Sequence, residues 1–540
     1  MQRLERQPNV YETFKVSQTQ LIQQNIHLLL HYNNHNITMS VQTFRNFNEL
    51  LMHNFTHHRS VAALEYSNGE RAETYTYREL SHRAYTVVNY LMADKISRDE
   101  KAVIWMPNCP EAIYVDLGFV LTGGIVTPLA PETSAADVAW VINDLQAKYV
   151  FVDTKAQLEA LAALRNKIPS VKKVIVREEI ELENEWMVPF YWMVNFPTQI
   201  VTLGEVHKIR EELHADSICN ILYDTKADKL VRKGIVVSHG NLLSAAQNVG
   251  SRLEWDAETE RKVQRYPNAQ SIATIPERLI GYWALLYHGK TMVISEPADG
   301  RSLAAHIEET EADFVVLSAD KLEFLRETIS GTLLDGNWGK WALSNGLKVS
   351  ERSLSGVPIP WLMRRWHKLY AKQRVRTRKK YFKNIHYVIV TDGALQEATA
   401  RFFHALDCVV LQSFGTTETL GFATLDSPAD PFPLGNGQAI NGVEVRTERY
   451  GVVAVSGVSV FKTYWKQVRQ TADAFTADGF FITDAKGHID TQKRLVVSPV
   501  SGANVKVEMN VDINVETNIE TPISAPIVTE NKESETTETT

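Results

Sequence analysis

Short apolar runs alternate with longer amphipathic segments along most of this chain, and this alternation limits the possible folds more than any other feature. In the first half the apolar runs are KAVIWMP (101–107), IVTPLA (125–130) and KYVFVDT (148–154), with apolar residues at helical spacing between them. Strands that alternate with helices form βαβ units, in which helices cover both faces of a parallel sheet. The pattern therefore predicts the α/β fold class.

The same alternation returns in the second half of the chain. Its apolar runs are KTMVIS (290–295), DFVVLS (313–318), IHYVIVTD (385–392) and CVVLQSF (408–414). We expect two doubly wound α/β subdomains within residues 44–445, with a ligand in the crevice at the carboxyl ends of the strands. Residues 446–490 are richer in strand-like sequence and predict a small β subdomain.

Composition excludes several classes of function. The 540 residues include 57 Lys and Arg against 64 Asp and Glu, a net charge of -7, and 44% are hydrophobic. Such a chain can bury a large core, and its mildly acidic balance argues against nucleic acid as a partner. The sequence has no run of 18 apolar residues and its start lacks the apolar core of a secretory signal, so we expect a cytoplasmic protein. Three cysteines without CxxC spacing predict neither a disulfide framework nor a thiolate metal site.

The two ends differ in composition from the rest of the chain. Residues 1–43 are rich in Gln and Asn and are treated as an N-terminal extension. Residues 511–540 are acidic, rich in Thr and nearly without aromatic side chains. Because such a segment cannot bury enough apolar surface to order itself, we expect a disordered tail there.

A basic segment separates two of the expected strands in the second half. Residues 361–384, WLMRRWHKLYAKQRVRTRKKYFKN, contain ten Lys or Arg and no acidic residue, interleaved with five aromatic residues. A basic helix that carries aromatic residues can lie on an anionic membrane surface. A solvated helical hairpin, whose charges only keep it soluble, explains the same pattern. The sequence leaves both interpretations open.

Several dispersed segments together resemble the adenylate-forming (AMP-binding) superfamily, and within it the long-chain acyl-CoA synthetases. They are TYTYRELSHRAYTVVNYL (74–91), the stretch from GGIVTPL to KYVFVD (123–153), LQSFGTTETLGF (411–422), VFKTYWKQVRQTADAFTADGFF (460–481) and GHID (487–490). The resemblance implies the fold described above followed by a small C-terminal domain, of which residues 491–510 would be a remnant. It also implies joining of a carboxylate to AMP with ATP and Mg²⁺, and transfer of the acyl group to coenzyme A. A fatty acid or acyl-CoA is then the expected partner.

The hexapeptide SFGTTE (413–418) supplies most of the site residues that the resemblance implies. Phe414 would stack near adenine, Thr417 would contact phosphate, and Glu418 would coordinate Mg²⁺, for which a carboxylate oxygen is a suitable ligand. Thr417 and Glu418 are the candidate catalytic residues. The candidate nucleotide-binding residues are Gly393 and Ala394 from TDGAL (391–395), together with Phe414, Gly415, Thr416 and Lys233.

The phosphate-binding loop of the superfamily is altered in this sequence. Its counterpart is YDTKADKLVRKG (223–234), where Tyr223, Lys233 and Gly234 match but the inner glycines and most hydroxyl residues are missing. Glycine is the residue that readily adopts the left-handed conformations by which successive N–H groups face a phosphate. We therefore expect an impaired phosphate loop.

Three further losses follow from the same resemblance. The ribose-binding aspartate falls on Ala485, while Asp484 comes one residue early, and strand register is expected to turn it away. The acyl-site histidine is deleted in TIPERLIGYW (274–283), and too little chain follows GHID to form the small domain with its catalytic lysine. These losses predict an acyl-CoA synthetase-like protein with lost or strongly reduced ligase activity and residual acyl or nucleotide binding. An active ligase with a divergent site and an interaction module without a small ligand remain as alternatives.

Overall fold

The computed structural model describes residues 44–498 apart from short gaps at 69–70, 180–184, 196–202, 225–231, 256–264, 269, 296–309, 334–336, 355–356, 370–383, 392, 394, 407 and 433. The expected extension at 1–43 and the expected tail at 511–540 lie outside these residues. Also outside the described residues are 499–510, which belong to the expected C-terminal remnant, and most of the basic segment beyond Leu369.

An eight-stranded sheet with the order β19-β9-β8-β4-β3-β5-β6-β7 forms the core of the first half. The strands from β8 to β7 run parallel to their neighbours, whereas β9 and β19 are antiparallel. The bounds are β3 Lys101–Trp105, β4 Ile125–Leu129, β5 Tyr149–Val152, β6 Lys173–Val176, β7 Met187–Pro189, β8 Ile218–Tyr223, β9 Gly234–Ser238 and β19 Thr463–Tyr464.

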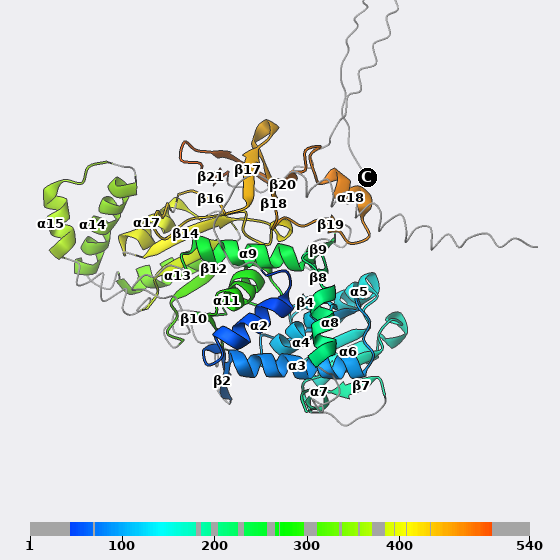
Figure 1. The fold of residues 1–540 in the computed structure, drawn as a ribbon. Helices are drawn as coiled ribbons and strands as arrows, with labels where there is room; N and C mark the ends of the chain where they lie inside the picture. Colours follow the sequence, from blue (N-terminus) through cyan, green and yellow to red (C-terminus); the bar gives the residue numbers. More distant parts are fainter. Residues whose placement is uncertain are drawn as a thin grey trace, which may run out of the picture. The chain divides into compact units, whose positions relative to one another are not determined.

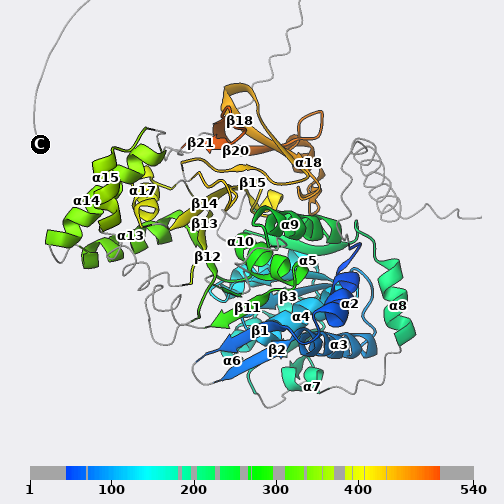
Figure 2. The ribbon, with the colours of Figure 1, turned by 60° about the vertical axis from the view of Figure 1, so that its left-hand side comes forward.

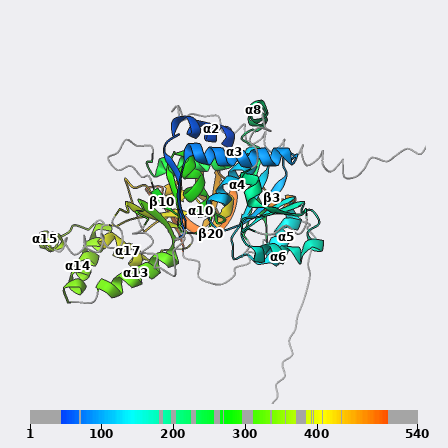
Figure 3. The same cartoon turned by 90° about the horizontal axis from the view of Figure 1, so that it is seen from below.

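Helices cover both faces of this sheet. Figure 3 shows α3 (Tyr77–Ala93) and α4 (Pro110–Leu121) on one side of β3, and α5 (Ala135–Leu145) and α6 (Lys155–Ala162) on the other. α4 is buried along its whole length, as its apolar sequence predicts, while α3 begins with a capping box formed by Thr76 and Glu79. The other helices of this half are α2 Phe47–His57, α7 Phe190–Val194, α8 Leu203–Glu212, α9 His239–Arg252, α10 Ile275–Arg278 and α11 Ala284–Tyr287.

The second half contains a five-stranded sheet with the order β12-β13-β14-β15-β16. β12 (Phe314–Ser318), β13 (Tyr387–Thr391) and β14 (Val409–Phe414) are parallel, and β15 (Thr424–Leu425) and β16 (Gln438–Ala439) are antiparallel. α13 (Ala319–Leu333) and α17 (Glu397–Ala405) connect to these strands, and α14 (Asn337–Leu354) and α15 (Trp361–Leu369) lie beyond α17 (Figure 1).

The strand expected at KTMVIS joins a third sheet rather than pairing with β12. This sheet has the order β10-β11-β1-β2, with bounds β10 Arg265–Pro267, β11 Thr291–Ser295, β1 Ala62–Ser67 and β2 Ala72–Thr76. It adjoins the five-stranded sheet because the backbone N–H of Asp313 donates to the carbonyl of Arg265 at 3.2 Å. Figure 2 shows β11 beside β1, far from it in sequence.

An antiparallel sheet with the order β17-β18-β20-β21 follows. Its strands are β17 Val443–Thr447, β18 Val452–Gly457, β20 Phe481–Ile489 and β21 Leu495–Val497, and α18 (Val468–Asp473) lies between β19 and β20 in the chain. β19 leaves this region and pairs with β9 of the eight-stranded sheet. Among the described residues, none of the helices is both long and apolar enough to cross a bilayer.

Candidate functional site

The turn after β14 is so tight that its first residue has to be glycine. A Cβ on Gly415 would lie 2.2 Å from the carbonyl carbon of Gly421, far below a possible contact, so this position requires glycine. The N–H of Gly421 donates to the carbonyl of Thr416 at 2.8 Å and closes the turn. The short helix η4 (Thr417–Thr419) begins inside it, and the N–H of Thr416 donates to Thr419 Oγ1 at 2.8 Å. The turn fixes where the candidate catalytic residue Glu418 lies.

Glu418 is held against β19 by two hydrogen bonds. The hydroxyl of Tyr464 donates to Glu418 Oε1 at 2.9 Å, and the N–H of Phe461 donates to the Glu418 carbonyl at 2.7 Å. Burial, followed by the negative charge of Glu418, raises the pKa of Tyr464, so its hydroxyl remains a proton donor at neutral pH. The carboxylate of Glu418 is half-buried and is oriented by this tyrosine.

Lys233 contacts the ring of the same tyrosine. Its ammonium Nζ lies 4.3 Å from the ring centroid of Tyr464, a distance typical of a cation–π contact. The contact arises because Lys233 immediately precedes β9, and β9 pairs with β19 so that Ile235 is opposite Tyr464. Strand pairing thus brings Lys233 and Glu418, which are far apart in sequence, onto one aromatic side chain with opposite charges.

The neighbouring residues of the altered loop have structural partners. The Arg232 guanidinium donates to Asp137 at 2.9 Å and lies 5.5 Å from the ring of Trp140. The Tyr223 hydroxyl donates to Asp144 at 2.6 Å. Residues 225–231 lie outside the described residues, so the prediction of an impaired phosphate loop stays a prediction.

The strand that carries Ala485 is irregular at this residue. Val452 of β18 pairs with Lys486 of β20, whereas Ala454 pairs with Ile482, so β20 has extra residues between these pairs. Ala485 is half-buried and packs against the hydrophobic core, and Asp484 is exposed. A methyl group at this position offers no acceptor to a ribose hydroxyl.

Asp484 is exposed and lies between buried Thr483 and half-buried Ala485 in β20. Its negative charge makes the smallest contribution to the raised pKa of the Tyr464 hydroxyl, after burial and Glu418. Buried and exposed residues alternate from Phe481 to Asp484, and the expectation that strand register turns Asp484 away from the ribose position stays a prediction. We refer to Lys233, Glu418 and Tyr464 as the Tyr464 cluster.

The candidate adenine residues follow neighbouring parallel strands. β13 and β14 pair in register, and Ser413 Oγ donates to the Val390 carbonyl at 2.9 Å near their carboxyl ends. Gly393 follows β13 with φ of +112°, a conformation that favours glycine, and half-buried Phe414 ends β14. The structure brings these two together at one sheet edge, whereas Ala394 lies outside the described residues.

The hydroxyl residues of the turn have different environments. Thr417 is half-buried at the start of η4. The Oγ1 atom of Thr416 is buried and has no hydrogen-bond partner within the described part of the chain. A buried hydroxyl without a partner is costly, so Thr416 is suited to a polar ligand group or a water molecule at this turn.

The segment aligned with the acyl-site motif is packed into the interior. Glu277 and Arg278 end α10, and the π-helix η2 (Leu279–Trp283) follows at once. The Arg278 guanidinium pairs with the Asp116 carboxylate at 2.7 Å, and these side chains are 0% and 1% exposed. Burial raises the pKa of Asp116, with the Arg278 charge opposing that effect.

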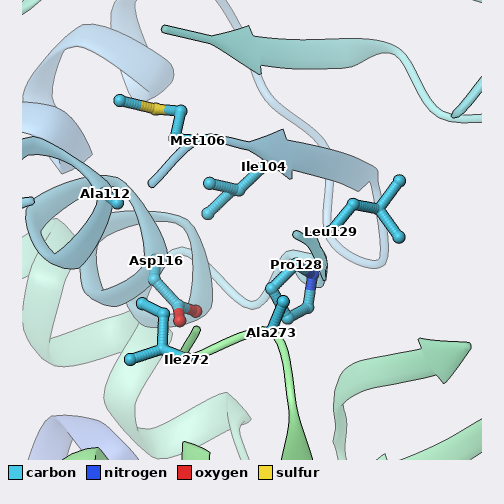
Figure 4. Close-up of a pocket in the computed structure, with 8 residues that line it drawn as sticks. All are labelled: Ile104, Met106, Ala112, Asp116, Pro128, Leu129, Ile272 and Ala273. Atoms are coloured by element: carbon cyan, nitrogen blue, oxygen red, sulfur yellow. The ribbon is translucent and has the colours of Figure 1, made fainter. Parts of the chain in front are cut away.

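A small cavity adjoins this ion pair. Its volume is about 10 Å³, which is roughly the room that one water molecule needs. Figure 4 shows the carboxylate of Asp116 among the apolar side chains that line it. The lining residues are Ile104, Met106, Ala112, Asp116, Pro128, Leu129, Ile272 and Ala273. A long acyl chain cannot enter a cavity of this size unless the surrounding segments move.

Sequence reasoning missed Tyr464, the residue that joins the two candidate charges. The signal was present, because TYW (463–465) lies within a segment that resembled the superfamily. Nothing in the neighbouring sequence singled out this tyrosine among the 19 of the chain. Its role depends on the β9–β19 pairing, which the sequence pattern did not reveal.

Comparisons with known proteins place the chain among its relatives. A family model described as AMP-binding enzyme matches residues 52–465. The long-chain-fatty-acid–CoA ligase ACSBG1 of Mus musculus is 22% identical over 464 residues, which cover 81% of this chain and 62% of that protein. The ligase ACSBG2 of the same species is 20% identical over 466 residues, covering 83% of this chain and 69% of that protein. The chain thus spans about six tenths of the length of the ACSBG1 relative.

Solved structures show the same fold. The N-terminal domain of FACL13 from Mycobacterium tuberculosis superimposes with a TM-score of 0.64 at 18% identity, covering 84% of this chain and 99% of that chain. Apo MatB from Rhodopseudomonas palustris gives a TM-score of 0.64 at 19% identity, covering 85% of this chain and 79% of that chain. These likenesses confirm the predicted α/β fold class with its β subdomain.

Proposed function

Because the chain belongs to the family of AMP-binding enzymes, we propose that it is a long-chain acyl-CoA synthetase-like protein whose ligase activity is lost or strongly reduced. Its residual function is binding of an acyl or nucleotide ligand. The ACSBG relatives are named as long-chain-fatty-acid–CoA ligases, which supports a fatty acid or acyl-CoA as the ligand. If the chain is active, ATP, Mg²⁺ and coenzyme A are the cofactors.

The observation that carries the proposal is Ala485. Its methyl group packs on the core at the position where the resemblance requires a carboxylate for the ribose hydroxyls. A buried polar group left without its partner costs about 1 to 3 kcal/mol, so a bound ribose would lose affinity and orientation there. Since adenylation requires the α-phosphate to be positioned in line with the attacking carboxylate, a loosely held nucleotide reacts slowly.

Some side chains suited to binding a nucleotide phosphate and a cation are retained. Glu418 offers a carboxylate oxygen and Thr416 a buried hydroxyl without a partner within the described residues, which is a donor set that fits Mg²⁺ and a phosphate oxygen. Lys233 adds a positive charge next to this turn. Bound Mg²⁺ would neutralise phosphate charge. These residues support residual nucleotide binding but offer no substitute for the ribose carboxylate.

The decisive experiment measures adenylation alone. Exchange of pyrophosphate into ATP should be followed with the purified protein and a panel of fatty acids of different chain length. We expect exchange that does not exceed that of the Glu418→Ala variant. Exchange that depends on the fatty acid at roughly 1 per second or more, an ordinary enzymatic rate, would refute the proposal.

The Tyr464 cluster favours a second candidate, an active ligase with a divergent site. Asp484 adjoins Ala485 in β20 and its charge acts on Tyr464, so its carboxylate could accept the hydrogen bonds that Ala485 cannot. In that case Asp484→Ala should abolish fatty-acid-dependent exchange. The matched control Asp473→Ala, which removes an exposed carboxylate from α18, should leave it unchanged.

Binding measurements separate residual ligand binding from an interaction module without a ligand. We expect a fatty acid or acyl-CoA to bind at micromolar or weaker affinity, because burial of apolar surface does not depend on the lost polar groups. ATP should bind at least tenfold more weakly, with little help from Mg²⁺. Equilibrium titration of both ligands tests this, and the absence of any binding would favour the interaction module.

A further inference from the structure

The helix α15 carries an unusual set of exposed side chains. Trp361 is 72% exposed, Leu362 49% and Trp366 40%, although large apolar residues are normally withdrawn from water. On α14, the 41% exposed ring of Trp341 meets Trp366 edge-on, with ring centroids 5.7 Å apart. We call Trp341, Trp361, Leu362 and Trp366 the tryptophan patch.

Positive charges lie beside this patch. Arg364, Arg365 and Lys368 are exposed on α15, and the described part of this helix has no acidic residue. At 3.6 residues per turn, Arg365 lies one turn from Trp361 and Lys368 one turn from Arg364, so charged and aromatic residues share one arc of the helix. We call these three residues the basic rim.

The position of α15 in the fold leaves this arc accessible. α15 packs against α14, and α14 in turn packs against α17 of the five-stranded sheet. Figures 1 and 3 show α15 farther from the strands than α14. The exposed acid Glu351 of α14 lies 3.4 Å from Arg401 of α17, so its charge is engaged on that side.

The charge distribution of the whole chain sets this segment apart. Residues 361–384 contain ten basic residues and no acid, whereas the complete chain carries -7. The rest of the chain is therefore strongly acidic, and an anionic surface would repel it. The exposed positive charges of α15 would instead be attracted to an anionic surface.

We propose that α15 docks the protein onto the surface of an anionic lipid bilayer. Tryptophan rings and leucine enter the boundary between headgroups and acyl chains, and the arginine and lysine heads remain at the level of the lipid phosphates. Trp361 and Leu362 supply the apolar insertion, and the basic rim supplies the attraction. This contact is independent of catalysis, because α15 contains none of the candidate site residues.

A bilayer fits these residues better than a nucleic acid. Val357, just before α15, and Leu362 are both exposed. Neither has a ring that could stack on a base, but both would leave water on entering the boundary between lipid headgroups and acyl chains. Binding to RNA through the same charges is the competing outcome that the experiment includes.

The test is co-sedimentation of the full-length protein with vesicles. Vesicles of phosphatidylcholine with 30 mol% phosphatidylserine are compared with phosphatidylcholine alone, at roughly 0.1 M and 0.5 M salt, a range over which surface charges become largely screened. We expect binding to the anionic vesicles that weakens at high salt. Each basic side chain near such a surface contributes about fivefold in partitioning, so Arg364→Ala, Arg365→Ala and Lys368→Ala together should weaken binding about a hundredfold.

Matched variants test whether binding depends on α15 or only on the total charge of the protein. The control Lys167→Ala, Lys172→Ala and Arg449→Ala removes the same charge from exposed residues outside α15 and should change binding less than twofold. Trp361→Ser with Leu362→Ser should weaken binding that persists at high salt. Circular dichroism and melting temperature should be unchanged in all variants, since every altered side chain is exposed.

Brominated lipids give an independent readout. Bromine in the upper acyl chain should quench tryptophan emission of the wild-type protein, and Trp361→Phe with Trp366→Phe should remove most of that quenching. Three results would overturn the proposal: no binding to anionic vesicles, equal weakening by the control variant, or preference for a single-stranded RNA over vesicles that depends on the basic rim.

Discussion

Replacement of Glu277 by Gln should change how the stability of this protein depends on pH. Glu277 is 0% exposed, accepts a hydrogen bond from the Tyr266 hydroxyl at 2.8 Å and another from the Asn268 amide. Burial raises the pKa of Glu277 from 4.5 to about 8, and these hydrogen bonds only partly oppose that effect. The side chain is therefore largely protonated in the folded protein at neutral pH, whereas the unfolded chain is ionised.

The size and sign of the effect follow from this difference in pKa. Because the pKa is raised in the folded state, the stabilising contribution of protonated Glu277 is complete below pH 4.5 and is lost as the pH rises towards about 8. Between these values the folded protein binds one proton more than the unfolded chain. The free energy of unfolding then falls by about 1.4 kcal/mol per pH unit from this group alone, or roughly 3 kcal/mol between pH 5.5 and 7.5.

Glutamine has nearly the same shape but cannot titrate, so Glu277→Gln removes this slope. The assay is urea unfolding of both proteins at pH 5.5, 6.5 and 7.5, followed by circular dichroism. The variant should gain stability relative to the wild-type protein by about 1.4 kcal/mol per pH unit. Glu327→Gln, at an exposed position on α13, is the control and should show no such trend. A difference between wild type and Glu277→Gln that stays constant over this range would refute the reasoning.

Three further substitutions test other parts of the structure. Arg278→Met leaves the buried Asp116 carboxylate unpaired and should lower the free energy of unfolding in urea by about 3 to 5 kcal/mol. Adding Asp116→Leu should recover most of this loss, and equal stability of the single and double variants would contradict the prediction. Gly415→Ala forces a Cβ into the Gly421 backbone, so melting should begin at lower temperature, and an unchanged curve would show that the turn is not rigid. Ala485→Asp combined with Asp484→Gly should tighten AMP binding in calorimetry, and unchanged affinity would mean that the pocket is closed or misaligned.

Alternation of strands and helices in the sequence was enough to predict the α/β fold. Helix α4 illustrates the reason, since its apolar sequence leaves burial as its only stable position. The SFGTTE turn was likewise predictable, because Gly415 has no room for a side chain and the sequence keeps glycine there. Both features depend on neighbouring residues in the chain, and local sequence therefore determines them.

Pairing between distant strands was not predictable in this way. β11 pairs with β1 rather than with β12. β19, which lies between strands of the β subdomain in the chain, pairs with β9 of the eight-stranded sheet. An apolar strand can be buried in any of several sheets with similar gain, so its sequence does not specify its neighbour. The extra residues in β20 depend on the pairing with β18 in the same way.

The sequence by itself determined the fold class, the family resemblance and the identity of the candidate residues Lys233 and Glu418. Only the tertiary structure decided that both meet on Tyr464, and that Glu277 and Arg278 are buried. The physical reason is that burial and charge pairing depend on which atoms surround a group. Those atoms come from segments hundreds of residues apart, which are brought together only when the sheets assemble.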